Sequence, residues 1–123
     1  MFEIEKIFSF EAGHLHVYHE GNCRRPHGHS YKLKIRLRHS QLAESGPQKN
    51  MVMDFQAISA VVRPMIETYF DHHWLNDTLQ TDTPTAEFIA YWIFCHLESR
   101  LPYLFSVTIA ETDTVSATYQ KSF

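Results

Sequence analysis

Apolar and polar residues alternate along four short stretches of the chain, a pattern typical of half-buried β-strands. The clearest stretch is 31–38, where the two faces are fully separated: Tyr31, Leu33, Ile35 and Leu37 on one, Lys32, Lys34, Arg36 and Arg38 on the other. Residues 2–11, 105–110 and 115–119 alternate in the same way, with Lys6 the one polar residue in the first apolar series. Acidic residues on the polar face of 2–11 predict that this strand pairs antiparallel with 31–38 through opposite charges.

Between the second and third strands, apolar residues recur at helical spacing in two stretches, which begin after Asp54 and after Thr83-Pro84. Asp54 is expected to cap the first helix, and Pro64 to kink it in its middle because proline lacks a backbone N–H. Thr83 supplies a capping hydroxyl for the second helix, with Pro84 at the first helical position.

The order ββααββ predicts an α+β fold, in which two helices cover one face of an antiparallel sheet. Four strands leave two edges unpaired. Edges that pair between subunits would close the sheet into a barrel, so an oligomer is expected.

Length and composition narrow the classes of protein to consider. A chain of 123 residues with 44% hydrophobic content fits one packed domain, 1–123. A net charge of -3 implies no general affinity for nucleic acid or membrane surfaces. The N-terminus lacks the pattern of a signal peptide, and no apolar run approaches the roughly 18 residues of a membrane span. Two cysteines make no disulfide framework, so a reducing cytoplasm is expected.

Candidate chemistry begins with two histidines at the entrance of the second strand. His27 and His29 flank Gly28, so in extended backbone both imidazoles point to the same side. If the first two strands pair as a hairpin, His14 at the end of the first strand meets them. Three imidazoles with an open fourth position are the pattern of a catalytic zinc site. The alternative is that these are surface loop histidines.

Cys23 lies four residues before His27 and leaves two interpretations open. It is either a fourth metal ligand, which would close the site and make it structural, or a free thiol beside the metal. Arg24 and Arg25 would favour its thiolate electrostatically. Cys95, between Phe94 and His96 in the second, amphipathic helix, is interpreted as a packing residue.

Three carboxylates are further candidates. Asp71 beside His72 indicates either a dyad that orients and charges the imidazole or a solvated loop. Glu111 continues the apolar face of the third strand, where a carboxylate needs a partner unless the strand has already ended. A ligand with N–H donors, such as a guanidine-like ring edge, would be a fitting partner.

Glu87 is not at the capping-box position of a helix capped by Thr83, so its carboxylate is not obviously used by the helix end. The basic row of 31–38 is either a solvated face or the lining of a polar barrel interior.

Six motifs of the chain, in order, match a known family. They are Phe10-Glu11-Ala12-Gly13-His14, Cys23-x-x-x-His27-Gly28-His29-Ser30, Met53-Asp54-Phe55, Asp71-His72-His73-x-Leu75-Asn76-Asp77, Pro84-Thr85-Ala86-Glu87 and Ala110-Glu111-Thr112. The chain thereby resembles the 6-pyruvoyl-tetrahydropterin synthase superfamily. The resemblance implies the tunnelling fold, in which ββααββ subunits join their sheets into a barrel and two such rings stack, giving a hexamer of two trimers.

The resemblance also implies roles for individual residues. His14, His27 and His29 would bind Zn2+, and Cys23 would accept a proton without being a ligand. His72 would relay protons with Asp71 and Glu111. Glu111 would also hold the guanidine-like edge of a pterin, with Thr85 and Glu87 near the ring, and the site would form between subunits. Arg24 and Arg25 are expected to contact the substrate's triphosphate.

Three residues separate Cys23 from His27-Gly28-His29, as in the carboxy-forming members of the superfamily, which serve queuosine (7-deazaguanine) biosynthesis. The implied reaction is a lyase reaction that converts 7,8-dihydroneopterin triphosphate into 6-carboxy-5,6,7,8-tetrahydropterin, acetaldehyde and triphosphate. Gly13, Leu15 and a shorter loop between His14 and Cys23 depart from the usual pattern. One alternative is the sister reaction that yields 6-pyruvoyl-tetrahydropterin. Another is a pterin- or purine-binding module whose zinc is structural.

Overall fold

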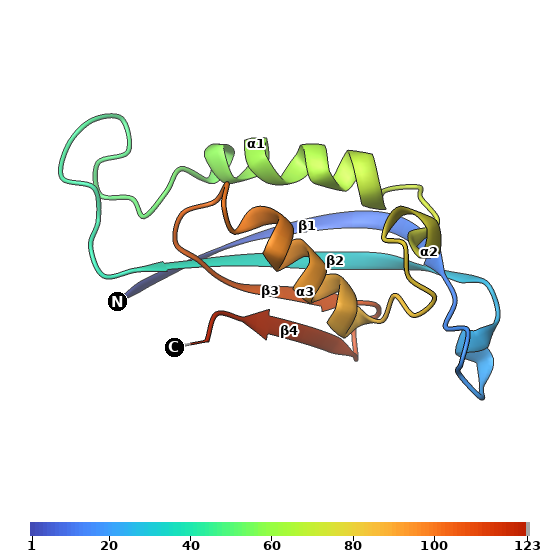
Figure 1. Ribbon diagram of the computed structural model, residues 1–123. Helices are drawn as coiled ribbons and strands as arrows, with labels where there is room; N and C mark the ends of the chain where they lie inside the picture. Colours follow the sequence, from blue (N-terminus) through green and yellow to red (C-terminus); the bar gives the residue numbers. More distant parts are fainter. Residues whose placement is uncertain (123) are drawn as a thin grey trace.

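Four antiparallel strands form the sheet of this protein, whose computed structural model describes residues 1–122. The strands are β1 (Phe2–His14), β2 (His27–His39), β3 (Leu104–Ala110) and β4 (Ser116–Gln120). They lie side by side in the order of the sequence, β1-β2-β3-β4, so each strand pairs with the one before it (Figure 1). The expected α+β architecture is confirmed.

The long β1–β2 hairpin follows from its alternation of apolar and polar residues. The four apolar side chains of 31–38 are fully buried, while their neighbours on the strand face outward. Glu3 lies opposite Arg38 and Glu5 opposite Arg36, with Oε–Nε distances of 2.7 and 2.6 Å. Such exposed pairs contribute at most about 1 kcal/mol each. Apolar burial therefore supplies most of the stability of the hairpin. The ion pairs join residues that lie directly opposite each other in the register of β1 and β2.

Both strands extend beyond the alternating stretches. Pairing continues through Gly13 and Gly28 to His14 opposite His27. The histidines and glycines here do not continue the alternation of apolar and polar residues. The strands predicted from that alternation are therefore shorter than the strands in the structure. This extension carries the three histidines on regular β-structure.

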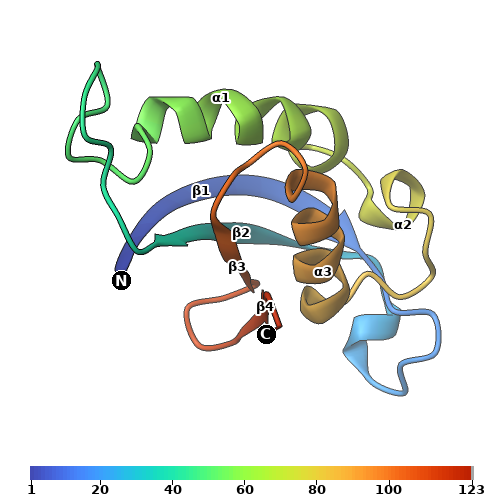
Figure 2. The same ribbon diagram turned by 60° about the vertical axis from the view of Figure 1, so that its left-hand side comes forward.

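Two helices cover the same face of the sheet, as expected (Figures 1 and 2). Helix α1 (Phe55–Met65) runs along β1, and α3 (Ala86–Leu97) packs on β3 and β4. Asp54 caps α1 as predicted, because its Oδ1 accepts a hydrogen bond from the Gln56 N–H at 2.9 Å. Both helices turn apolar residues towards the sheet, and these join one hydrophobic core with its buried side chains.

Pro64 lies inside α1, one residue before its last residue, and the regular α-helical pattern ends directly after it. The chain continues from Ile66 to Phe70 as a wider π-helical turn, η2, which Asp71 closes by donating its N–H to the Ile66 carbonyl at 2.8 Å. Ile66 and Phe70 are buried there, so the apolar spacing of the sequence persists although the hydrogen-bond pattern changes.

The predicted start of the second helix is wrong by two residues. Thr85, not Thr83, is the N-cap of α3, and its Oγ1 accepts a hydrogen bond from the Phe88 N–H at 3.1 Å. Pro84 therefore lies before the helix, where its carbonyl is free to accept a hydrogen bond from His14 across the molecule.

Two short helices occur in segments that the sequence presents as loops: η1 (Asn22–Arg24) and α2 (Leu75–Thr78). Leu75 is fully buried and anchors α2, whereas Trp74 is only half-buried.

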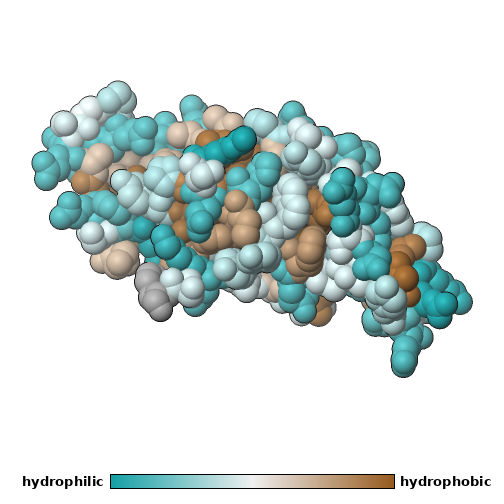
Figure 3. All heavy atoms as spheres, viewed as in Figure 1, coloured by the Kyte–Doolittle hydropathy of each residue, from teal (hydrophilic) through white to brown (hydrophobic). Residues whose placement is uncertain are grey.

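Cys95 is exposed, so its interpretation as a packing residue is wrong: it lies on the outer face of α3. Figure 3 shows a mostly hydrophilic surface with apolar residues in small patches. Among the described residues, no helix is long and apolar enough to cross a membrane.

Candidate metal centre and active site

Three histidines converge where β1 ends and β2 begins. His14 lies directly opposite His27, and His29 lies opposite Ala12, two residues earlier on β1. The ring centroids are 4.5 Å apart for His14 and His27, 5.0 Å for His14 and His29, and 4.9 Å for His27 and His29. The hairpin thus brings together the imidazoles that the sequence singles out.

Backbone carbonyls hold two of these rings by their Nδ1 atoms. His14 Nδ1 lies 2.8 Å from the Pro84 carbonyl oxygen, and His27 Nδ1 lies 2.7 Å from that of Arg25. A carbonyl oxygen only accepts hydrogen bonds, so each Nδ1 carries the proton and each Nε2 has a free lone pair. In metal sites, a ligating histidine commonly donates its other ring N–H to a carbonyl oxygen in this way, which fixes the orientation of the ring.

Glu111 completes the cluster from β3. The strand ends at Ala110, and the next side chain turns to the histidines: Oε2 of Glu111 is 3.0 Å from His29 Nε2 and 3.5 Å from His14 Nε2. The carboxylate therefore has partners within the chain. The interaction with the His14 side chain is the main cause that holds the pKa of Glu111 below its ordinary value, against the opposing effect of burial.

The donor set of this cluster fits a zinc ion. One candidate atom from each of His14, His27, His29 and Glu111 lies within 4.8 Å of all the others. Burial lowers the pKa of His29, although Glu111 acts in the opposite direction, so the ring favours the neutral form that binds metal. Imidazole nitrogens and a carboxylate oxygen are common zinc ligands.

Tyr31 and His16 adjoin the cluster, and the sequence did not assign either of them to the site. The Tyr31 hydroxyl lies 3.2 Å from His14 Nδ1, and burial raises the pKa of this phenol far above its ordinary value, so it stays neutral. The His16 ring contacts His14 edge-on at 4.8 Å between centroids, and burial lowers its pKa. Two features of the sequence could have pointed to them. Tyr31 is the first residue of the apolar row of the second strand, and His16 lies two residues after His14.

Cys23 stands outside the four-residue cluster. It lies in η1 and is half-buried, and its carbonyl accepts a hydrogen bond from the His16 N–H at 2.7 Å. Arg24 and Arg25 next to it are exposed. The thiol is therefore near the histidines in the chain but is not one of the converging donors.

Asp71 and His72 form a pair that is fastened to the edge of β1. One carboxylate oxygen of Asp71 accepts from the Glu11 N–H at 2.9 Å, and the other lies 3.0 Å from His72 Nδ1. The Glu11 hydrogen bond, followed by that of His72, lowers the pKa of Asp71. His72 donates its own N–H to the Glu11 carbonyl, has φ of 60°, and leaves 79% of its side chain exposed. The sequence left a dyad or a solvated loop open, and the pair is both bonded and exposed.

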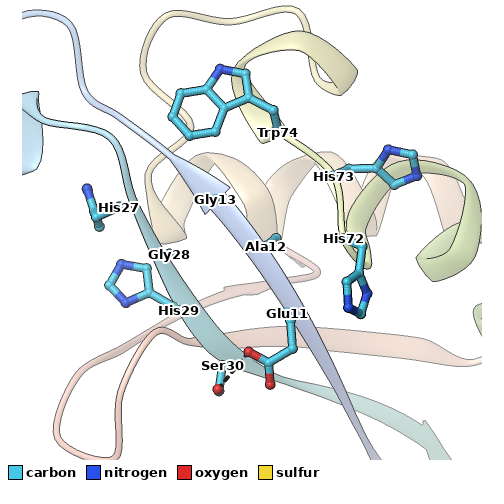
Figure 4. Close-up of a pocket in the computed structure, with 10 residues that line it drawn as sticks. All are labelled: Glu11, Ala12, Gly13, His27, Gly28, His29, Ser30, His72, His73 and Trp74. Carbon is cyan, nitrogen blue, oxygen red and sulfur yellow. Dashed lines mark hydrogen bonds between the residues drawn. The ribbon is translucent and has the colours of Figure 1, made fainter.

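A surface pocket of about 560 Å³ is lined by His72 from this pair and by His27 and His29 from the histidine cluster. In Figure 4, His27 and His29 lie on one side of β1, and His72, His73 and Trp74 lie on the other. Gly13 lies between them, and a Cβ there would make a tight contact with the Trp74 ring at 3.1 Å. On the pocket wall, the Ser30 hydroxyl donates to Glu11 Oε2 at 2.8 Å.

Thr85 and Glu87 lie at the start of α3. Thr85 is the helix cap, and Glu87 is exposed in the first turn. The hydrogen bond from His14 to Pro84 fixes this segment beside the histidine cluster. Neither side chain is one of the four converging donors.

Comparison with known proteins gives consistent matches over almost the whole chain. The family model described as 6-pyruvoyl tetrahydropterin synthase matches residues 3–122. A Synechocystis protein named 6-carboxy-5,6,7,8-tetrahydropterin synthase is 44% identical over 97% of this chain and 93% of its own. A Haemophilus influenzae protein of the same name is 33% identical over 98% of this chain and 100% of its own.

Among solved structures, 6-pyruvoyl tetrahydropterin synthase of Caenorhabditis elegans superposes with a TM-score of 0.80. The two chains are 28% identical, and the match covers 98% of this chain and 96% of the other.

Proposed function

The chain belongs to the 6-pyruvoyl tetrahydropterin synthase family, and from this premise we propose that it is a zinc-dependent 6-carboxy-5,6,7,8-tetrahydropterin synthase. The substrate would be 7,8-dihydroneopterin triphosphate, and the products 6-carboxy-5,6,7,8-tetrahydropterin, acetaldehyde and triphosphate. Similarity to the Synechocystis and Haemophilus relatives supports the choice within the family. The observation that carries the proposal is the convergence of His14, His27 and His29 where β1 ends and β2 begins.

His14, His27 and His29 would hold the zinc ion. When bound, zinc supplies Lewis acidity, which acidifies the side-chain hydroxyls of the substrate and stabilises enolate-like charge. The two carbonyls that fix His14 and His27 support this role, because they leave Nε2 of each ring available.

The remaining residues would bind the pterin and move protons. Cys23 as thiolate would remove a proton from the substrate side chain, and His72, oriented by Asp71, would transfer protons on the other side. Glu111 would accept hydrogen bonds from the guanidine-like edge of the pterin, with Thr85 and Glu87 near the ring. Arg24 and Arg25, both exposed, would contact the triphosphate.

The reaction needs no external redox cofactor. Triphosphate leaves by elimination, and a retro-aldol-like cleavage of a carbon–carbon bond releases acetaldehyde. The ring is reduced while the side-chain carbon that remains on it is oxidised to a carboxylate, and one water is consumed. This internal balance agrees with a chain in which no Gly-rich dinucleotide motif is found.

The assembly we propose is a hexamer of two trimers, with each site between subunits. β1 and β4 are the edge strands of the described sheet, and both are open to pairing with another copy. The exposed imidazole of His72 is suited to a site completed by a neighbour. The free thiols of Cys23 and Cys95 support a place in the cytoplasm, where queuosine synthesis would use the product.

The decisive test is a product assay. Zinc-loaded protein is incubated with 7,8-dihydroneopterin triphosphate, acetaldehyde is measured enzymatically, and the pterin product is identified by mass. We expect one acetaldehyde for each carboxy-pterin formed, and none with protein stripped of metal. A pterin of pyruvoyl mass without acetaldehyde would indicate the sister reaction. Binding of the pterin without turnover would indicate a binding module.

A further inference from the structure

We propose that Asn76 is a positioning residue of the histidine centre. Its side-chain amide holds the backbone of Leu15, the residue directly after His14, and thereby fixes a metal ligand at the end of β1. The inference rests on the proposed function in one respect, namely that the histidines bind zinc.

The segment that follows η2 runs parallel to the end of β1, and Figure 4 shows the two side by side. The His72 N–H donates to the Glu11 carbonyl at 2.6 Å. The Gly13 N–H donates to the His73 carbonyl at 3.2 Å, and Gly13 forms a parallel bridge with Trp74. These contacts use every second residue of β1, because alternate residues of a strand direct their backbone groups to the same edge. They cover only the end of that edge and leave the longer part of the strand for the pairing between copies proposed above.

Asn76 continues this row of contacts beyond the point where the backbone of the segment can do so. The next residue of the row is Leu15, but the segment has by then turned into α2, which begins at Leu75. The Leu15 N–H donates to Asn76 Oδ1 at 2.9 Å, and Asn76 Nδ2 donates to the Leu15 carbonyl at 3.0 Å. The amide of asparagine combines a C=O acceptor with N–H donors, as a peptide group does. Asn76 therefore takes the place of a strand partner for Leu15.

The short helix α2 gives Asn76 a firm base. Leu75 and Leu79 are buried in the hydrophobic core on either side of it in the sequence. The Thr78 hydroxyl donates to the Tyr69 carbonyl at 2.7 Å. These anchors hold α2 in place independently of the two hydrogen bonds that Asn76 makes to β1.

The hold on Leu15 reaches His14 through the peptide bond between them. That bond is planar, so fixing the Leu15 N–H also fixes the carbonyl group of His14. The His14 ring is held separately, because its Nδ1 lies 2.8 Å from the Pro84 carbonyl oxygen. His14 is therefore restrained at its backbone and at its ring, and such support keeps a metal ligand in its binding geometry.

The first experiment separates positioning from stability by two substitutions of similar size in α2. Asn76→Leu removes both hydrogen bonds to Leu15, and Thr78→Val removes the bond to the Tyr69 carbonyl; both side chains are half-buried. Urea unfolding of the metal-free proteins measures stability, and competition with a chelator measures zinc affinity. We expect both variants to unfold at lower urea concentrations than the wild type. Only Asn76→Leu should bind zinc more weakly, by about tenfold, the smaller effect of groups that orient a ligand.

Cobalt(II) gives a spectroscopic readout of the same difference. The d–d absorption of the cobalt-substituted protein depends on the geometry of the ligands, so it should change in Asn76→Leu and match the wild type in Thr78→Val. Asn76→Ser, whose side chain is too short to reach both backbone groups, replaces Asn76→Leu if that variant does not fold. A wild-type spectrum and zinc affinity in the Asn76 variant would overturn the inference, and so would equal changes in the Thr78 variant.

Amide hydrogen exchange tests the contact in the zinc-loaded wild type without any substitution. The Leu15 N–H should be protected from exchange, and the protection should be lost in Asn76→Leu while the amides in the middle of β1 keep theirs. Rapid exchange at Leu15 in the wild type would refute the contact. A wild type that binds no zinc would overturn the proposed function together with this inference. Acetaldehyde production by a protein whose metal binding is insensitive to Asn76 would overturn the inference alone.

Discussion

Two single backbone carbonyls decide which nitrogen is free on two histidines of the candidate metal centre. Pro84 and Arg25 each accept a hydrogen bond from an imidazole Nδ1, so the lone pairs of His14 and His27 are both on Nε2. The sequence can identify the histidines as candidate ligands, but it does not show which ring nitrogen would face a metal. The tautomer is thus set by groups whose side chains have no part in the chemistry.

The two cysteines provide a matched pair for testing the proposed proton acceptor. Cys23→Ala should lower kcat about 10²- to 10⁴-fold, because it removes a general base, while the bound zinc stays at the wild-type amount. Steady-state kinetics and metal analysis check both effects. Cys95→Ala, which changes an exposed thiol on α3, should leave both quantities unchanged. A Cys23→Ala protein that has lost its zinc would instead identify the thiol as a ligand.

His96 predicts a pH dependence of stability that is separate from the metal site. Burial against Trp92, and then the charge of Arg100, lower its pKa below the ordinary 6.5. The unfolded chain therefore binds the proton more readily, and the free energy of unfolding falls as the pH drops below about 6.5. Urea unfolding of metal-free protein at pH 5.5 and 7.5 should show a smaller difference for His96→Gln than for the wild type. An equal difference would assign the effect to other groups.

The start of α3 links stability to the site at the element scale. Thr85 caps the helix, and the residue before it holds His14 by its carbonyl. If the helix began two residues earlier, with Thr83 as its cap, Pro84 would lie inside the helix. Its carbonyl would then not be in place to accept the hydrogen bond from His14. The cap therefore fixes the distance between α3 and the end of β1.

Loss of this cap should be measurable in substrate-free protein. Thr85→Ala should lower the free energy of unfolding by about 1 kcal/mol, and Thr85→Ser should restore most of it, because the hydroxyl accepts the Phe88 N–H. Urea denaturation gives both values. Thr83→Ala is the control, since Thr83 does not cap the helix. A larger loss in Thr83→Ala than in Thr85→Ala would contradict the assignment.

At the scale of the whole molecule, the open sheet is the feature that calls for other copies. β1 and β4 have unpaired outer edges in the described chain, and residues near them such as Ile7 and Val115 are about half exposed. A sheet closed between copies would cover such edges.

Light scattering coupled to size-exclusion chromatography tests the assembly. We expect a mass of about 87 kDa, six times the chain's 14.5 kDa. Dilution to nanomolar concentration should leave this mass unchanged, because edge pairing around a closed barrel leaves no free edge to dissociate. A mass near that of one chain would contradict both the hexamer and a site shared between subunits.

The order of strands and helices, the antiparallel pairing of the first two strands and the neighbourhood of the three histidines could be predicted from the sequence. These depend on short-range periodicity, which assigns a face to each residue of β1 and β2 once the strands pair. It located Asp54 as a cap for the same reason, since the cap and the helix it begins are adjacent.

Which groups complete the site depends on contacts between distant segments of the chain. The Pro84 carbonyl reaches His14 across 70 residues, and Glu111 turns to the histidines although its strand has ended. Cys95 proved exposed because the packing of α3, and not its own neighbours, selects the buried face. Contacts between distant segments follow from how elements pack, and no local pattern of residues records that packing.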